Sequence, residues 1–267
     1  MTGPFIALGT VAVVVALAAL GMRALLRAAN SHRARQLAEP GAMLGLMPID
    51  ALPPDLPPFE LLNTGTSRDA APILGGSIAG VEVIVFDYMF NDPRVIGFTG
   101  VHYHNHVATA TIACAKGSQL GLPPFAIEPD KSAAAREAEA TVAQQAGDAM
   151  GRAAHALMSL AEGMASIQPG WRFSDRPDVR YLVRNGDQAA VRDAFTTPVL
   201  DFFRGHQGWI VEGDGDWVLV TFSSQLRLPG FDPSQQRLDT GQLKPDQLGA
   251  LVRAAVDTIA AFRASRT

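Results

Sequence analysis

The chain has 267 residues, of which 48% are hydrophobic and 18% are charged, so it can bury one or two cores and is not a disordered chain. From position 36 onward it carries 18 basic residues (22 less the four before that position) against 26 acidic ones, a formal charge of −8. Such a domain repels phosphate backbones, which argues against nucleic acid as a ligand. The single cysteine, Cys114, excludes an intramolecular disulfide.

An apolar segment opens the chain. The first 22 residues carry no charged side chain, and residues 5–22 are apolar apart from one threonine. As a helix this run is roughly 27 Å long, close to the ~30 Å hydrocarbon core of a bilayer, and the next residues can extend it. We therefore predict a short tail at residues 1–4 and a transmembrane helix at residues 5–26 that holds the protein in a lipid bilayer.

The charges beside this segment predict its orientation. Basic side chains follow its C-terminal end, namely Arg23, Arg27, His32, Arg33 and Arg35, whereas the N-terminal flank has only the α-amino group. The positive-inside rule then places the C-terminal part in the cytoplasm. A cleaved signal peptide is the alternative, but such peptides carry basic residues before a shorter apolar core.

Residues 27–72 are predicted to form a juxtamembrane connector. The membrane helix is expected to continue to about Ala38, after which the six prolines between positions 40 and 58 exclude a long helix. These are Pro40, Pro48, Pro53, Pro54, Pro57 and Pro58. We expect extended chain with short turns here, and one short strand at residues 59–62.

A soluble α+β domain is predicted for residues 73–267, beginning with a β-rich part at residues 73–129. Residues 76–88 are rich in β-branched and apolar side chains and lie between turn signals, which is typical of a strand. In residues 104–115, Val and Thr alternate with Ala and Ile, so we expect a second strand that pairs antiparallel with the first. The hairpin tip between them is expected at residues 94–101. The prolines of residues 122–129 suit an edge strand or the lead into a helix.

Residues 130–166 are predicted to form an Ala-rich helix, with Asp130 or Ser132 as N-cap. Its apolar positions alternate steps of three and four: Ala143, Ala146, Met150, Ala153, Leu157, Leu160 and Met164. This seam is compatible with a partner helix, and therefore with a protein partner or self-association. Packing against the chain's own sheet is the simpler alternative.

The last part, residues 171–267, is predicted to be a second α+β unit. A strand at 180–184 precedes a helix capped by Asp187, which Pro198 kinks or splits. Two β-rich runs at 209–212 and 217–222 flank an Asp-Gly turn, which is typical of a hairpin. A final amphipathic helix runs from Pro245 to Arg263. The predicted fold class is α+β, a transmembrane helix followed by antiparallel β-hairpins packed with helices.

Several segments of the sequence resemble those of a family of uncharacterised, single-pass, membrane-anchored bacterial proteins that share a domain of unknown function. These are the basic-flanked span and residues 80–88, 122–125, 173–183, 195–200 and 211–217. The resemblance implies a location in the bacterial plasma (inner) membrane and carries no established activity. The helix at 131–166 and the His-rich second strand depart from the family's pattern.

Three histidines are the most specific candidate for a metal-binding site in the sequence. His102, His104 and His106 alternate along a predicted strand and therefore share one side, where a bent strand aims two or three imidazoles at Zn²⁺ or Cu²⁺. The spacing is wide for tetrahedral ligation, and no carboxylate or thiol follows at ligand spacing. A polar, solvent-facing strand near a hairpin tip is the simpler interpretation.

The sequence contains no recognisable motif for hydrolase or nucleotide-binding activity. The residues Gly76-Ser77-Ile-Ala-Gly80 depart from the G-x-S-x-G elbow, and no phosphate-binding loop occurs. Cys114 is expected in the core, and Asp87 at a solvated strand end. Trp209 and Trp217 are expected to pack as cross-strand neighbours. We assign no catalytic, cofactor-binding or metal-binding residue.

Two hypotheses follow. The first is a membrane-tethered cytoplasmic binding or scaffolding domain that uses its sheet or residues 131–166. The alternative is a metal-binding or metal-dependent enzyme domain centred on the strand from His102 to His106.

Overall fold

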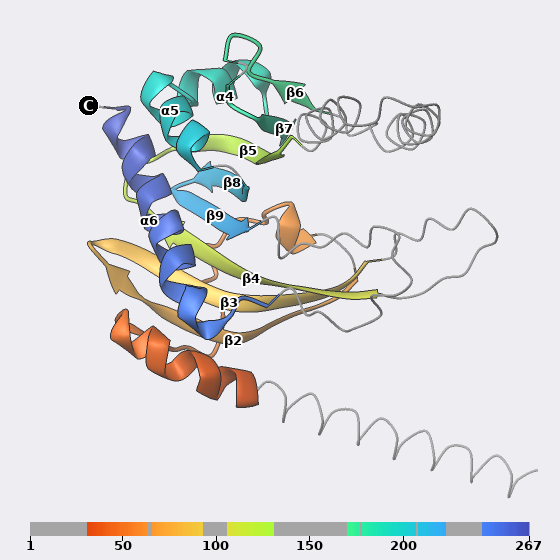
Figure 1. Ribbon diagram of the computed structural model, residues 1–267, viewed down its shortest axis with the longest axis vertical. Helices are drawn as coiled ribbons and strands as arrows, with labels where there is room; N and C mark the ends of the chain where they lie inside the picture. The colour runs from red at the N-terminus through yellow and green to blue at the C-terminus, as the bar shows by residue number, and fades with distance from the viewer. Residues whose placement is uncertain are drawn as a thin grey trace, which may run out of the picture.

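The computed structural model describes residues 31–63, 66–92, 106–130, 170–176, 178–206, 208–222 and 242–266. Within these residues nine strands form one antiparallel sheet in the order β1-β2-β3-β4-β9-β8-β5-β7-β6 (Figure 1). The α+β class is confirmed, and the two β-rich parts of the sequence share this sheet. The strands are β1 (Leu46–Pro48), β2 (Thr66–Ile78), β3 (Val81–Asp92), β4 (His106–Lys116), β5 (Leu122–Pro129), β6 (Trp171–Arg172), β7 (Tyr181–Asn185), β8 (Trp209–Gly215) and β9 (Trp217–Phe222).

The helices of the described residues come from two parts of the chain. Residues 31–43 are helical, and α4 (Gln188–Ala194), α5 (Thr197–Gly205) and α6 (Leu248–Ala264) lie in the last third. Short 3₁₀ turns are η1 (Leu61–Asn63) and η2 (Pro245–Gln247), the latter leading into α6. None of the helices in these described ranges is long and apolar enough to cross a membrane. The predicted transmembrane segment at residues 5–26 and the predicted helix at 131–166 lie outside them.

The first hairpin differs from its prediction. The apolar run at 76–88 contains a two-residue turn, so that Ile78 ends β2 and pairs with Val81 at the start of β3. Ala79 and Gly80 both have positive φ, of 51° and 75°, as hairpin turns whose twist matches the strands require. Glycine adopts this conformation without strain, and an Ala-Gly turn carries a weaker sequence signal than Asn-Gly. The predicted pairing of the second run is confirmed, because β4 is antiparallel to β3.

Strand β5 lies inside the sheet, so its prediction as an edge segment or helix lead was wrong. It pairs with β8 on one side and β7 on the other. Its ladder with β8 is interrupted between Leu122 and Phe125, and the two prolines between them therefore occupy positions where no regular ladder is formed.

The last third follows its predicted order. Asp187 accepts a hydrogen bond from Ala190 N–H at 2.8 Å and caps α4, and the helical region is split before Pro198, which lies in the first turn of α5. Strands β8 and β9 form the predicted hairpin. The predicted tryptophan pair was wrong, because Trp209 lies opposite Phe222 and Trp217 lies opposite Asp214.

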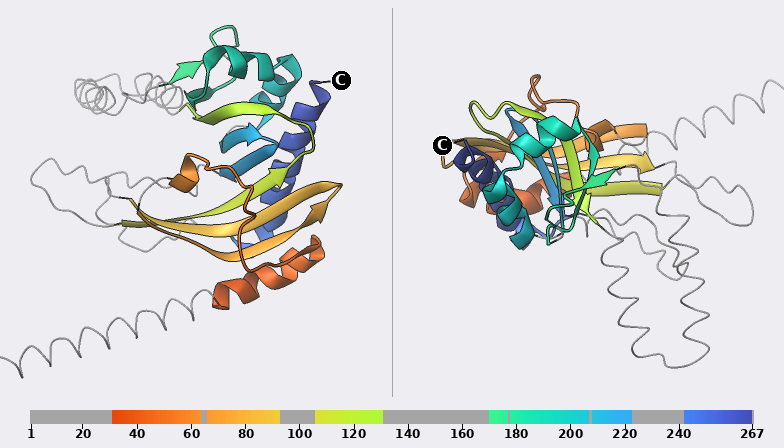
Figure 2. Two further views of the ribbon diagram at one scale, coloured as in Figure 1. Left: turned by 180° about the vertical axis from the view of Figure 1, so that it is seen from behind. Right: turned by 90° about the horizontal axis from the view of Figure 1, so that it is seen from above.

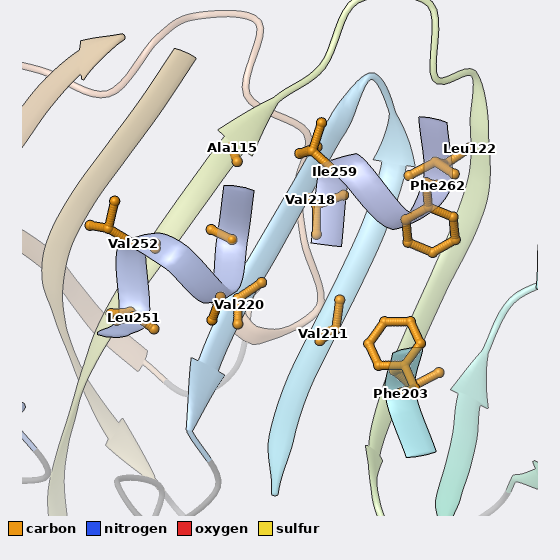
Figure 3. Packing of buried hydrophobic residues seen from close by; sticks show 14 of the residues in the cluster. Ala115, Leu122, Phe203, Val211, Val218, Val220, Leu251, Val252, Ile259 and Phe262 are labelled. Carbon is orange, nitrogen blue, oxygen red and sulfur yellow. The ribbon is translucent and has the colours of Figure 1, made fainter. Parts of the chain in front are cut away.

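One face of the sheet is covered by helices. Helix α6 crosses this face (Figure 1), and α4 and α5 lie beside it over the β5 end of the sheet. The predicted apolar face of α6 is buried against the sheet, as Figure 3 shows for Ile259 near Val218 and for Phe262 near Leu122. Leu37 from the helix at 31–43 belongs to the same hydrophobic core.

The Pro-rich chain after the first helix covers the other face, where η1 lies across the sheet from α6 (Figure 2, left). Phe59 and Leu61 are buried there, and Tyr88 Oη donates a hydrogen bond to Leu62 O at 2.6 Å. The strand predicted at 59–62 is instead irregular chain ending in a 3₁₀ turn. The connector is therefore packed against the sheet, and its residues Leu52, Leu56, Phe59, Leu61 and Leu62 belong to a second core on this face.

Candidate functional site

A buried ion pair joins the helix at 31–43 to the centre of the sheet. Arg33 Nε lies 2.7 Å from Asp87 Oδ2, and the two side chains are 9% and 0% exposed. Asp87 follows Val83 and Val85 on the inward side of β3, and Leu37 anchors the same helix one turn after Arg33. Asp87 was predicted at a solvated strand end, which was wrong because its side chain faces the helix-covered core.

The remaining polar atoms of this pair are satisfied by its neighbours. Thr111 on β4 donates to Asp87 Oδ1 at 2.6 Å and accepts from Leu243 N–H at 2.9 Å. Arg33 Nη2 donates to Leu243 O at 2.7 Å. Leu243 lies two residues before η2, the turn that leads into α6. The cluster, which we call the Arg33 junction, therefore ties the first described helix, two central strands and the start of the last helix together.

The Arg33 junction changes the role assigned to one basic residue. Arg33 was predicted to be one of the charges flanking the membrane span, yet its charge is balanced by Asp87 inside the domain. His32 and Arg35, on either side of it, are exposed. A helix places neighbours in sequence on different sides, so a run of basic residues does not reveal which one turns inward.

A second polar cluster lies on the opposite face, over β8, β5 and β7. Arg184 on β7 lies 3.6 Å from Glu128 on β5, measured from Nε to Oε2, and 3.2 Å from Glu60 of the connector, from Nη2 to Oε1. Glu212 on β8 accepts a hydrogen bond from Leu61 N–H at 2.9 Å. We call Glu60, Glu128, Arg184 and Glu212 the carboxylate cluster.

Within the carboxylate cluster, Glu212 is deeply buried. Its residue is 1% exposed, and burial raises its pKa from 4.5 to about 7, helped by the negative charge of Glu60. The hydrogen bond from Leu61 N–H and the charge of Arg184 oppose this shift. Glu212 is therefore partly protonated at neutral pH, a property that proteins often use at binding and catalytic sites.

The structure describes only part of the histidine cluster that the sequence suggested as a metal site. His102 and His104 lie outside the described residues, and His106 begins β4 opposite Asp92, at the end of the described ladder. The described ranges hold no group of three His, Cys, Asp or Glu side chains that could hold a metal ion, so the histidine hypothesis stays a prediction. Cys114 is fully buried, as predicted, and burial raises the pKa of its thiol.

The outer helices carry a shallow hollow between α5 and α6. It is lined by Pro198, Phe202, Asp257, Ala260, Ala261 and Ala264. Its lining is mainly apolar and offers one carboxylate, which supplies no set of groups for chemistry. The carboxylate cluster is therefore the better candidate site among the residues that the structure describes.

Sequence reasoning missed both clusters. In β3 a signal was present, because Asp87 continues the inward alternation of Val81, Val83 and Val85. For the carboxylate cluster no local signal exists, because its members come from the connector and from three strands, and Glu60 and Glu212 are 152 positions apart.

Comparisons with known proteins add little. No protein-family model matches the chain, and no curated protein sequence matches it. Among solved structures, the crystal structure of the mycobacterial trehalose monomycolate transport factor A, TtfA, aligns with a TM-score of 0.42 and 12% sequence identity, over 86% of this chain and 92% of that chain. A similarity this low does not indicate a shared function.

Proposed function

We propose that this chain is a single-pass protein of the bacterial plasma membrane, in which residues 5–26 anchor a cytoplasmic α+β domain that binds other molecules. The uncharged apolar N-terminal segment and the basic residues after it support the anchor and its orientation. The resemblance of the sequence to uncharacterised membrane-anchored bacterial proteins supports the assignment to the bacterial membrane. The observation that carries it furthest is the Arg33 junction.

The Arg33 junction limits how far the domain can lie from an anchor. Leu26 and Arg33 are seven positions apart, which corresponds to about 10 Å in a helix and at most about 25 Å in an extended chain. Arg33 is bound inside the domain through Asp87. With residues 5–26 in the bilayer, the sheet is held next to the membrane surface rather than on a long tether.

A binding role is supported by the carboxylate cluster and by the acidic charge of the domain. Glu128 and Arg184 each leave a buried polar atom without a hydrogen bond, and the formal charge of −8 after position 35 attracts basic partners. The Ala-rich seam at 131–166 is a further surface proposed for a protein partner or for self-association.

The anchor is tested by expressing the full chain in bacteria with a reporter fused after Thr267. We expect the protein to stay in the membrane pellet after alkaline carbonate extraction, to keep its first 26 residues, and to carry a reporter that is active in the cytoplasm. Release by carbonate, or a mature N-terminus after residue 22, would contradict the proposal. A reporter active only outside the cytoplasm would contradict the orientation.

Two variants serve as controls for this test. Deletion of residues 1–26 keeps the Arg33 junction and should release the chain from the pellet. Replacement of Arg23 and Arg27 by Gln leaves Arg33 in place and should weaken the orientation preference without changing the stability of the domain.

The proposed partner surface at residues 131–166 is tested by deleting these residues. The deletion should remove protein partners captured by the full chain, and unchanged partners and oligomeric state would remove this seam from the proposal.

A further inference from the structure

Glu128 carries a buried carboxylate oxygen without a hydrogen-bond donor. Its side chain is 9% exposed, and its Oε1 atom is buried and receives no hydrogen bond. Its other oxygen, Oε2, lies 3.6 Å from Arg184 Nε, too far for a hydrogen bond, and Nε also lacks a partner. Buried polar atoms of folded proteins are almost always paired, so this carboxylate keeps capacity for a donor that comes from outside.

The carboxylate cluster holds three glutamates and one arginine. Arg184 divides its guanidinium between Glu128 and Glu60. Glu212 lies on β8, next to β5, and pairs with Ala126 of β5. Its carboxyl group accepts a hydrogen bond from the backbone N–H of Leu61, which is a neutral donor and does not balance a negative charge. Two buried carboxyl groups on neighbouring strands therefore face one shared guanidinium.

We infer that the carboxylate cluster binds one primary ammonium or guanidinium group, with Glu128 Oε1 accepting its hydrogen bond beside the neighbouring carboxyl group of Glu212. This inference rests on the proposed binding function and names its ligand class. An organic cation brings both the missing donor and the missing charge. The described part of the chain groups no three His, Cys, Asp or Glu side chains for a metal ion, so an organic cation fits this cluster better.

The carboxylate cluster reaches the surface through its outer members. The Glu60 side chain is 38% exposed and that of Arg184 is 25% exposed, so an approaching cation meets these two groups first. The acidic domain raises the local concentration of cations by long-range attraction. The same ligand chemistry can come from a lysine or arginine of a protein or from a free amine.

The test uses the full chain in detergent micelles, labelled with carbon-13 at the glutamate carboxyl carbons. Ethylammonium, N-ethylguanidinium and the neutral N-ethylurea are titrated in turn at constant ionic strength, and the shift of the Glu128 resonance is followed. We expect saturable shifts with both cations and a Kd at least tenfold lower than for N-ethylurea. A lysine tripeptide with blocked ends that binds more tightly than ethylammonium assigns the ligand to a protein, and equal binding assigns it to a free amine.

Matched variants decide the outcome, with the Glu212 resonance as the common readout. Glu128→Gln should raise the Kd of ethylammonium at least tenfold, whereas Glu82→Gln, at an exposed position of β3, should leave it unchanged. If Glu128→Gln does not fold, Glu60→Gln at the exposed rim should raise the Kd severalfold. Equal shifts with N-ethylurea, or an unchanged Kd in Glu128→Gln and Glu60→Gln, would overturn the inference. Membrane retention is measured on the same preparations and reports separately on the anchor.

Discussion

The Arg33–Asp87 pair and the Arg184–Glu128 pair each join a guanidinium to a buried carboxylate, but on opposite faces of one sheet. The first pair closes at 2.7 Å, and the hydroxyl of Thr111 and the backbone of Leu243 complete its hydrogen bonds. The second stays at 3.6 Å and leaves one atom of each partner without a hydrogen bond. A buried ion pair stabilises a fold only when its remaining polar atoms are satisfied, so the first pair is structural and the second has capacity for a ligand.

The largest expected effect comes from breaking the complete pair. Asp87→Asn leaves the Arg33 guanidinium buried without a counter-charge, and we expect the free energy of unfolding to fall by about 3–5 kcal/mol. Urea denaturation of the full chain in detergent, followed by tryptophan fluorescence, measures this loss. Asp69→Asn on β2, an exposed position, is the matched control and should change it by less than about 0.5 kcal/mol.

A double replacement sharpens this test. Arg33→Met with Asp87→Leu removes both charges together, and we expect most of the lost stability to return because neither charge remains unpaired. A loss below about 1 kcal/mol in Asp87→Asn would show that the junction does not hold the first helix to the sheet.

The next effect concerns Glu212 and depends on pH. Its pKa is about 7 in the folded chain and 4.5 ordinarily, so between these values the folded state binds more protons than the unfolded state. Stability should therefore fall as pH rises from about 4.5 to about 7, by up to about 3 kcal/mol in total. Glu212→Gln keeps an acceptor for Leu61 N–H and should remove this fall.

Urea denaturation at pH 5 and pH 8 measures the difference for the wild type, for Glu212→Gln and for the exposed control Glu82→Gln. We expect the control to keep the wild-type dependence. A Glu212→Gln chain with the same pH dependence as the wild type would show that another group titrates over this range.

The smallest effect is expected for the incomplete pair. Glu128→Gln removes a carboxylate that makes no hydrogen bond through Oε1, while Arg184 keeps Glu60 at 3.2 Å. We expect the free energy of unfolding to change by about 1 kcal/mol or less, measured in the same way. A loss as large as that of Asp87→Asn would contradict the difference drawn between the two pairs.

Elements with strong local signals were predictable from the sequence. The N-cap at Asp187, the break before Pro198, the Asp-Gly hairpin and the amphipathic α6 are each encoded by neighbouring residues. Where local signals were weak, prediction failed. The Ala79-Gly80 turn lies within one apolar run, and β5 carries prolines that normally exclude an interior strand.

By itself, the sequence determined the α+β class, most elements of the last third and the burial of Cys114, because periodicity, caps and turn residues act over a few positions. Only the tertiary structure decided that β9 and β8 insert between β4 and β5 to make one sheet, and that Arg33 meets Asp87 inside it. Both depend on contacts between residues at least 54 positions apart, which no local pattern records. The carboxylate cluster arose in the same way, from strands that meet only when the sheet is complete.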